Sequence, residues 1–338
     1  MMPAYALPLF AAVAAAVVLA TGVLLGWLRR RQILDRPNER SSHTRPTPRG
    51  GGLAVMAVVL PAWAVATGWT LAGDALPEAT ALAFAAVLAV LSWLDDLLTL
   101  PALPRFLVQG VAVTAVLLVL PREALVFQGV LPLPLDRLLA GLCWLWFVNL
   151  YNFMDGIDGI TGVQTASLGG GLVLLAAAGL APAALGMPGL VVTAAALGFL
   201  FWNWHPARLF MGDVGSVPLG FLLGFLLIVL AGSGHLAAAL ILPLYYVVDA
   251  SVTLIRRLLR GEKPWQAHRS HFYQRAVRAG LSHARVSGAV AVVNAGLIGC
   301  ALAAAAGAPW AGLAAAAVLV AGFCALLARR ARAAGVLR

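Results

Sequence analysis

Long apolar runs follow one another along the whole chain and constrain its fold more than any other feature. About eleven such runs lie near residues 4–28, 51–72, 79–94, 105–121, 134–151, 162–181, 188–204, 215–232, 236–256, 285–306 and 309–328. A helix crosses a bilayer with roughly 20 apolar residues. Because only 11% of the 338 residues are charged and 62% are hydrophobic, a soluble core is excluded. We therefore predict an all-α polytopic membrane protein, with residues 1–338 forming a single transmembrane domain.

The lysines and arginines gather in alternate connections between these runs. Of the 23, 21 lie in or beside one set of loops, and only Arg122 and Arg137 lie in the other. The basic set comprises loops of about 29–50, 95–105, 152–161, 205–214 and 257–284 and the tail 329–338. Since basic loops stay in the cytoplasm, we predict that the N-terminus lies outside and the C-terminus in the cytoplasm. This distribution accounts for the net charge of +10 without a nucleic-acid partner.

Five aspartates fall on the predicted cytoplasmic side, each at the end of a span. They are Asp95, Asp96, Asp155, Asp158 and Asp213. If they were only ordinary loop residues, acids would occur on both faces without special neighbours. Asp95 and Asp96 are adjacent and would point about 100° apart on a helix, so we expect them to serve different partners.

The segment NLYNFMDGIDG spaces Asn149, Asn152, Asp155 and Asp158 three residues apart. Three-residue steps place side chains on one face of a helix, so two amides and two carboxylates are expected to line one wall. A turn at the membrane surface would explain the Asp-Gly pairs but not the asparagines one turn earlier. We interpret the segment as part of a site for cations or phosphates.

Two further stretches add to this interpretation. In RLFMGDVGSVPLG, Asp213 lies between glycines, and Gly212 and Ser216 flank the start of a span, an arrangement that suits a hard cation or a phosphate. Upstream, Arg208 adds positive charge or anchors the chain at the membrane interface.

The last basic loop carries His268 and His271, with Arg269 and Arg275 interleaved. Zinc would need further ligands, so a basic pocket for pyrophosphate fits better. An amphipathic surface helix on anionic lipid would explain the arginines but not the histidine pair. The first basic loop, RPNERSSHTRPTPRGGG, has no nucleophile-and-base pattern, and we interpret it as architectural.

Together the loops offer the groups that metal-assisted phosphoryl transfer uses. Carboxylate oxygens favour Mg²⁺ or Mn²⁺, and arginines favour phosphate. Such a site neutralises charge on the transferred group.

The strings LDDLL, NLYNFMDGIDG and RLFMGDVGSVPLG, followed by a late histidine loop, resemble the polyprenyl-phosphate N-acetylhexosamine-1-phosphate transferases. This family includes the phospho-MurNAc-pentapeptide translocases and the GlcNAc-1-phosphate transferases that initiate O-antigen or teichoic acid synthesis. The likeness runs from about Ser41 to Arg285. It implies Mg²⁺-dependent transfer of a sugar 1-phosphate from a UDP-sugar to undecaprenyl phosphate, with release of UMP.

By motif position, the resemblance implies that Asp213 binds Mg²⁺ beside the nucleotide diphosphate. Asp95 and Asp96 would orient or deprotonate the lipid phosphate and help to hold the metal. Asn152, Asp155 and Asp158 would shape the nucleotide pocket, and His271 would contact the diphosphate. The resemblance leaves direct attack and a covalent aspartyl intermediate both open, and the sequence leaves a homodimer open.

One segment departs from the family pattern. The segment HRSHFYQR replaces the His-x-His-His cluster of members that handle GlcNAc 1-phosphate and the His-His-His run of the translocases. It resembles the O-antigen-initiating branch that uses other UDP-N-acetyl sugars, such as UDP-N-acetylfucosamine or UDP-N-acetylquinovosamine. Peptidoglycan synthesis is therefore not favoured.

The main alternative from another class is an ion-coupled secondary transporter. Transporters place coupling carboxylates near the bilayer midplane, and here only Asp249 lies within an apolar run. We expect Asp249 to pair with a neighbouring helix or to line the cleft. A membrane scaffold without enzymatic activity would not need the Asp-Gly motifs.

Overall fold

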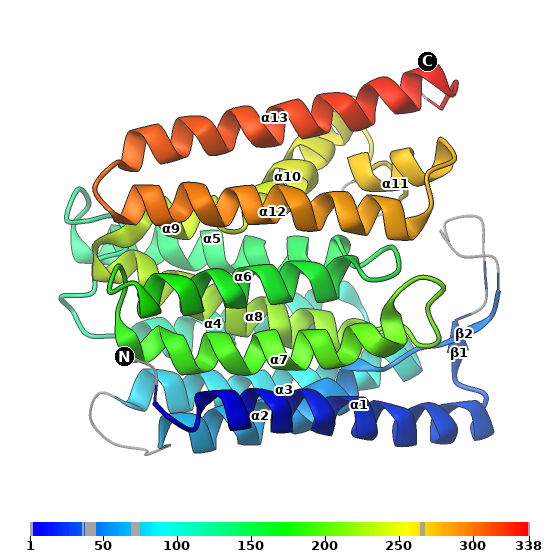
Figure 1. Ribbon diagram of the computed structural model, residues 1–338, viewed down its shortest axis with the longest axis horizontal. Coiled ribbons are helices and arrows are strands. Elements are labelled where there is room, and N and C mark those ends of the chain that lie inside the picture. The colour runs from blue at the N-terminus through cyan, green and yellow to red at the C-terminus, as the bar shows by residue number, and fades with distance from the viewer. Residues whose placement is uncertain (1–2, 36, 38–44, 69–74, 264–267, 337–338) are drawn as a thin grey trace.

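The computed structural model describes residues 3–35, 37, 45–68, 75–263 and 268–336 and is almost entirely helical (Figure 1). Its elements are α1 (Ala6–Arg30), β1 (Leu34–Asp35), β2 (Thr47–Pro48), α2 (Gly52–Thr67), α3 (Leu76–Leu98), α4 (Ala102–Val119), α5 (Leu133–Phe153), α6 (Ile160–Ala177), η2 (Ala183–Leu185), α7 (Gly186–Asn203), α8 (Asp213–Leu230), η3 (Ala231–His235), α9 (Leu236–Ile241), α10 (Leu244–Leu259), α11 (Phe272–Arg278), α12 (His283–Ala305) and α13 (Pro309–Ala333). The two short strands pair antiparallel, Leu34 with Pro48 and Asp35 with Thr47.

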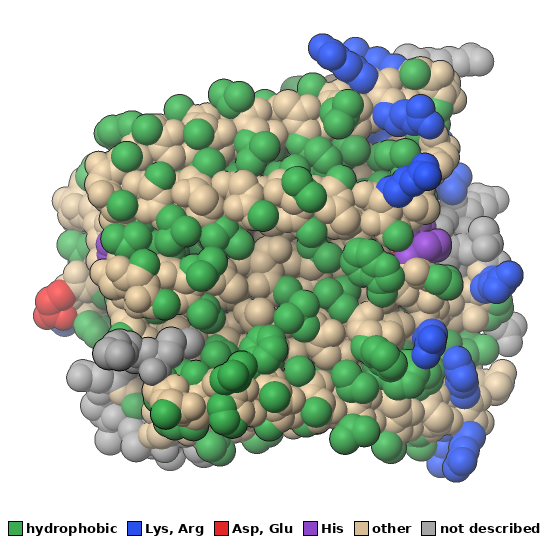
Figure 2. All heavy atoms as spheres, viewed as in Figure 1, with side chains coloured by type: hydrophobic (Ala, Val, Ile, Leu, Met, Phe, Trp, Pro, Cys, Tyr) green, Lys and Arg blue, Asp and Glu red, His purple; other side chains and the backbone are tan. Residues whose placement is uncertain are grey.

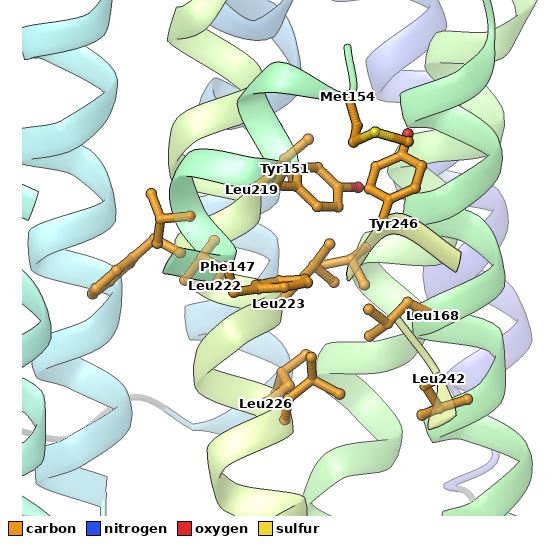
Figure 3. Packing of buried hydrophobic residues seen from close by; sticks show 14 of the residues in the cluster. Phe147, Tyr151, Met154, Leu168, Leu219, Leu222, Leu223, Leu226, Leu242 and Tyr246 are labelled. Carbon is orange, nitrogen blue, oxygen red and sulfur yellow. The ribbon is translucent and has the colours of Figure 1, made fainter. Parts of the chain in front are cut away.

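Helix α8 forms the centre of the bundle. Sixteen of its eighteen residues are buried, which a helix achieves only when neighbours cover it on every side. Helices α3 and α5 pack along it. Figure 3 shows Phe147 and Tyr151 of α5 next to Leu219, Leu222 and Leu223 of α8.

Glycines let the helices approach α8 closely. A Cβ atom on Gly52 would lie 2.2 Å from the Cα atom of Gly215, so the starts of α2 and α8 are in backbone contact. Farther along α8, a Cβ atom on Gly224 would lie 2.3 Å from the indole ring of Trp144. Interiors packed at this density do not accept an extra methyl group without movement. These contacts fix the start of α8, where Asp213 lies.

Nine helical segments within the described residues are long and apolar enough to cross a membrane. Helix α2 is a shorter apolar helix, and residues 69–72 of its expected span lie outside the described residues. The expectation of one helix near 236–256 is wrong. Helix α8 is followed by a kink at Ser233 and Gly234, where the backbone leaves the helical conformation, and then by the short helix α9. The chain breaks again before α10 at Pro243. Proline lacks the N–H group that would continue the helix.

Positive charge gathers at one end of the bundle. The last turns of α1, α10 and α13 carry arginines, and Figure 2 shows Lys and Arg side chains along that end, with Asp and Glu at the other. We call it the basic end. The N-terminus lies at the opposite end and the C-terminus at the basic end (Figure 1). The assignment of the basic end to the cytoplasm stays a prediction.

Candidate active site

Asp95 and Asp96 end α3 at the basic end and serve different partners, as their spacing predicts. Asp95 accepts the backbone N–H of Leu100 at 2.7 Å and pairs with Arg105. Asp96 turns the other way and accepts the N–H groups of Asp213 and Val214, the first two residues of α8, at 3.3 and 3.1 Å. A carboxylate at this position also stabilises the positive end of the helix dipole.

The first N–H groups of α8 are therefore not available to a phosphate. They are bonded to Asp96, so of the two ligand classes that the Gly-Asp-x-Gly-Ser string suggested, the geometry favours a cation. Gly212 has φ of 75° and lies so close to Asp96 that a Cβ atom would be 2.7 Å from Oδ2. Only glycine adopts this conformation and approach readily.

Two arginines that the sequence reasoning did not assign to the site lie among the aspartates. Nη2 of Arg49 is 2.8 Å from Oδ1 of Asp96 and 2.7 Å from Oδ1 of Asp213. Arg105 pairs with Asp95, and its Nη1 lies 3.4 Å from Oδ2 of Asp213. Burial lowers the pKa of Arg49, but Asp213 and Asp96 outweigh it and raise that pKa above its usual value. The loop interpreted as architectural thus supplies a charged side chain to the site.

The four polar residues of the 149–158 segment do not form one wall, because α5 ends at Phe153. Asn152 reaches the acidic cluster: its amide N–H lies 3.4 Å from Oδ2 of Asp213, and its Oδ1 accepts the hydroxyl of Ser216 at 2.7 Å. Asn149, one turn earlier, instead donates to Gln109 of α4 at 2.9 Å.

Asp155 lies in the loop after α5 and accepts the hydroxyl of Thr161 at 2.6 Å. Burial, together with the nearby charge of Asp213, raises the pKa of Asp155 to about 6. Next to it, a Cβ atom on Gly156 would lie 2.2 Å from the hydroxyl of Tyr273. The Asp-Gly loop and α11 are therefore in direct contact.

Asp158 is enclosed by two histidines. Its carboxylate lies 2.6 Å from Nδ1 of His205 and 3.1 Å from Nδ1 of His283, and it accepts the N–H of Ala207 at 3.1 Å. These are hydrogen-bond lengths. Burial raises the pKa of Asp158, but the histidines, His283 first, outweigh it and bring that pKa below its usual value. The carboxylate thus joins the Asp-Gly loop, the 204–212 loop and α12.

His271 directly precedes α11 and is almost fully buried, with Nδ1 3.1 Å from Oδ1 of Asp249. Asp249 also accepts the N–H groups of Phe272 and Tyr273 at 3.0 and 3.3 Å. Asp249, within its apolar run, therefore holds the histidine loop to α10. This agrees with the expectation that Asp249 pairs with a neighbouring helix, and a carboxylate bonded in this way does not suit an ion relay. The contact of His271 with a diphosphate stays a prediction.

The remaining basic candidates lie around this core. His268 bonds Ser270 at 2.9 Å, and burial and neighbouring His271 lower its pKa to about 4. Arg275 is buried in α11, whereas Arg269 is exposed. Arg208 is also exposed and stacks on Trp202, 5.5 Å from the ring centre.

The acidic cluster fits a hard divalent cation. One oxygen of Asp96 and one of Asp213 both lie within hydrogen-bond distance of the same nitrogen atom, so they converge on one point. Mg²⁺ and Mn²⁺ prefer oxygen ligands in such an arrangement. Metal binding by Asp95, Asp96 and Asp213 stays a prediction.

The fold and the cluster define a polytopic helical membrane protein with carboxylates and arginines converging at one end. The family described as "Glycosyl transferase family 4" matches residues 79–231. A Bacillus subtilis protein named "probable undecaprenyl-phosphate N-acetylglucosaminyl 1-phosphate transferase" is 32% identical over 272 residues, which cover 74% of this chain and 71% of that protein. The chain belongs to glycosyl transferase family 4.

Two further relatives carry related names. The decaprenyl-phosphate N-acetylglucosaminephosphotransferase of Mycolicibacterium smegmatis is 30% identical over 304 residues, covering 77% of this chain and 73% of its own length. A phospho-N-acetylmuramoyl-pentapeptide-transferase of a Synechococcus species is 32% identical over 241 residues, covering 64% of this chain and 67% of its own length. These similarities favour a transferase over the transporter alternative.

Proposed function

We propose that this chain transfers an N-acetylhexosamine 1-phosphate from a UDP-sugar to undecaprenyl phosphate on the cytoplasmic face of a bacterial inner membrane. The reaction releases UMP and leaves a lipid diphosphate sugar. The observation that carries the proposal is the convergence of Asp95, Asp96 and Asp213 with Arg49 and Arg105 at the basic end. The names of the family relatives support the reaction class.

In this proposal Asp213, Asp95 and Asp96 hold Mg²⁺, which would offset charge on the diphosphate and the departing UMP. The protein keeps these carboxylates in place beforehand: Asp96 is bonded to the start of α8, and Asp95 to the chain after α3. On the other side of Asp213, the amide of Asn152 donates to its Oδ2, and Ser216 holds Asn152 in place. Groups fixed before the substrate arrives lose little free energy to reorganisation during the reaction.

The lipid phosphate arrives along the membrane plane at the basic end of the bundle. Asp95 or Asp96 orients it or accepts its proton, and Arg105, which follows the break between α3 and α4, adds positive charge there. The nucleotide is held by the Asp-Gly loop with Asp155 and Asp158 and by the histidine loop with His271. The contact of Gly156 with Tyr273 joins these two loops.

For the sugar, we propose an N-acetylated hexosamine that initiates O-antigen or another cell-surface glycan. The segment His268-Arg-Ser-His271-Phe-Tyr-Gln supports a sugar other than GlcNAc because it departs from the histidine clusters of the branches that use GlcNAc or MurNAc-pentapeptide.

The test is an assay on washed membranes that contain the expressed chain, undecaprenyl phosphate, Mg²⁺ and one UDP-sugar at a time. We expect UMP release with at least one UDP-N-acetyl sugar and loss of that release in Asp213→Asn. The variant Arg30→Gln removes an exposed charge from the same end and is the matched control. Absence of UMP release with every sugar, or release that persists in Asp213→Asn, would refute the proposal.

A further inference from the structure

Arg49 occupies the point at which the two central carboxylates converge. Its Nη2 atom bridges Oδ1 of Asp96 and Oδ1 of Asp213 at 2.8 and 2.7 Å. The two aspartate side chains are only 3% and 17% exposed, whereas that of Arg49 is 38% exposed. Arg49 is therefore the most accessible of these three side chains.

The backbone around Arg49 is fixed while its side chain reaches inward. Pro48 accepts the N–H of Phe210 at 2.9 Å, and Gly50 and Gly51 donate to the carbonyl of Phe210 at 3.2 and 2.8 Å. Gly50 has φ of 113° and packs against Trp93, where a Cβ atom would lie 2.6 Å from the indole ring. Any movement of the guanidinium away from the aspartates thus involves side-chain torsions alone.

A divalent cation held by both aspartates competes with Arg49 for the same oxygens. Mg²⁺ binds oxygen at about 2.0–2.1 Å, so an ion shared by Asp96 and Asp213 would lie where Nη2 now lies. Asp96 has little freedom to turn, because its two oxygens accept N–H groups of Asp213 and Val214. Two positive groups at one point repel each other, so one excludes the other.

We propose that Arg49 is an exchangeable counter-ion: it yields Asp96 and Asp213 to the metal and then binds the diphosphate of the nucleotide substrate. This inference rests on the proposed function. Guanidinium groups bind phosphate oxygens in paired hydrogen bonds, and the released side chain remains anchored beside the cluster. Metal alone then binds weakly, because it must displace Arg49, whereas metal and nucleotide bind cooperatively.

The test measures Mn²⁺ affinity by electron paramagnetic resonance on the purified full chain, with and without UDP, after subtraction of the Mn²⁺–UDP complex formed in solution. For the wild type we expect UDP to tighten Mn²⁺ binding about tenfold, within the usual range of coupling between two ligands. In Arg49→Gln we expect Mn²⁺ alone to bind about tenfold more tightly than in the wild type. The effect of UDP should be reduced, because only the direct attraction between the metal and the diphosphate remains.

Two further variants make the result specific. Arg49→Lys keeps the charge and is expected to keep Mn²⁺ binding as weak as in the wild type, while Arg30→Gln, a charge loss outside the cluster, is expected to change neither affinity. Mn²⁺ binding in Arg49→Gln that equals or falls below the wild-type affinity, or an unchanged effect of UDP, would overturn the inference. UMP release by the wild type is measured separately, so failure of the inference can be distinguished from failure of the proposed function.

Discussion

The two ends of the bundle hold their aspartates in different ways. At the end opposite the basic end, Asp136 is fully buried and accepts the N–H groups of Val126 and Phe127, ten and nine residues before it. At the basic end, Asp213 contacts Arg49 and Arg105, which lie 164 and 108 residues away. One acid closes a local loop, and the other joins distant segments.

We infer from this difference that Asp136 stabilises the fold and that Asp213 serves the reaction. Asp136 is fully buried and bonded within its own loop, so a ligand cannot reach it. The guanidinium groups beside Asp213 are partly exposed, and we propose that they give way to a metal or a phosphate. We therefore expect substitutions at Asp136 to act on folding and substitutions at Asp213 to act on the reaction.

The largest expected effect is that of Asp213→Asn. We expect UMP release to fall about 100-fold or more, the size of effect seen when a group that stabilises transition-state charge is removed. The thermal unfolding midpoint in detergent should change little, because Asn keeps the shape and still accepts hydrogen bonds. A near-normal rate, or a large loss of stability, would break the proposed division between the two ends.

The converse variant is Asp136→Ala. It leaves the N–H groups of Val126 and Phe127 without their acceptor, which costs about 1–3 kcal/mol for each buried group. We expect a lower unfolding midpoint, an intermediate value for Asp136→Asn, and an unchanged rate of UMP release per folded molecule. Loss of rate without loss of stability would contradict this assignment.

A smaller effect is expected from Gly156→Ala, which sharpens the comparison within the basic end. The new methyl group would overlap the hydroxyl of the buried Tyr273, and overpacking of this kind costs about 1–3 kcal/mol. We expect the methyl group to displace the Asp-Gly loop and to lower kcat/KM for the UDP-sugar about tenfold, a loss of about 1.4 kcal/mol of transition-state stabilisation. Gly110→Ala in α4, where a Cβ atom meets nothing within 4 Å, is the matched control.

The smallest effect concerns pH. The folded pKa of Asp155 is about 6, above its ordinary value of 3.8, so the folded state holds this proton more tightly than the unfolded chain does. Its ionisation therefore removes stability as the pH rises from about 4 to about 6 and has no further effect above that range. In the presence of a chelator, the unfolding midpoint of Asp155→Asn relative to wild type should rise across this interval. A constant difference would contradict the assigned pKa.

Much of the architecture could be predicted because hydrophobicity and charge are local signals. The apolar runs identify most of the helices, and the end of α3 at Asp95 and Asp96 and the start of α8 at Asp213 follow from them. The break at Pro243 was missed because the apolar run continues across it, and hydrophobicity does not report hydrogen bonding. The prediction that Asn149 and Asp155 share one face was wrong, because the end of α5 at Phe153 leaves no mark in a three-residue spacing.

The arginines of the site could not be predicted for a different reason. Arg49 and Arg105 contact aspartates that lie far away along the chain, and no repeating pattern of residues marks such pairs in a sequence. Arg49 stands out only weakly, as a charged residue beside the glycine run of PTPRGGG. The histidine partners of Asp158 likewise come from separate segments, the 204–212 loop and the start of α12.

The central claim is that carboxylates from α3 and α8 bind one divalent cation at the basic end. Anomalous diffraction from crystals of the full chain grown with Mn²⁺ and UDP tests it most directly. The account predicts a peak about 2.2 Å from oxygens of both Asp96 and Asp213, with the Arg49 guanidinium moved away from them. A peak at Asp158, His205 and His283 instead, or none near Asp213, would contradict it.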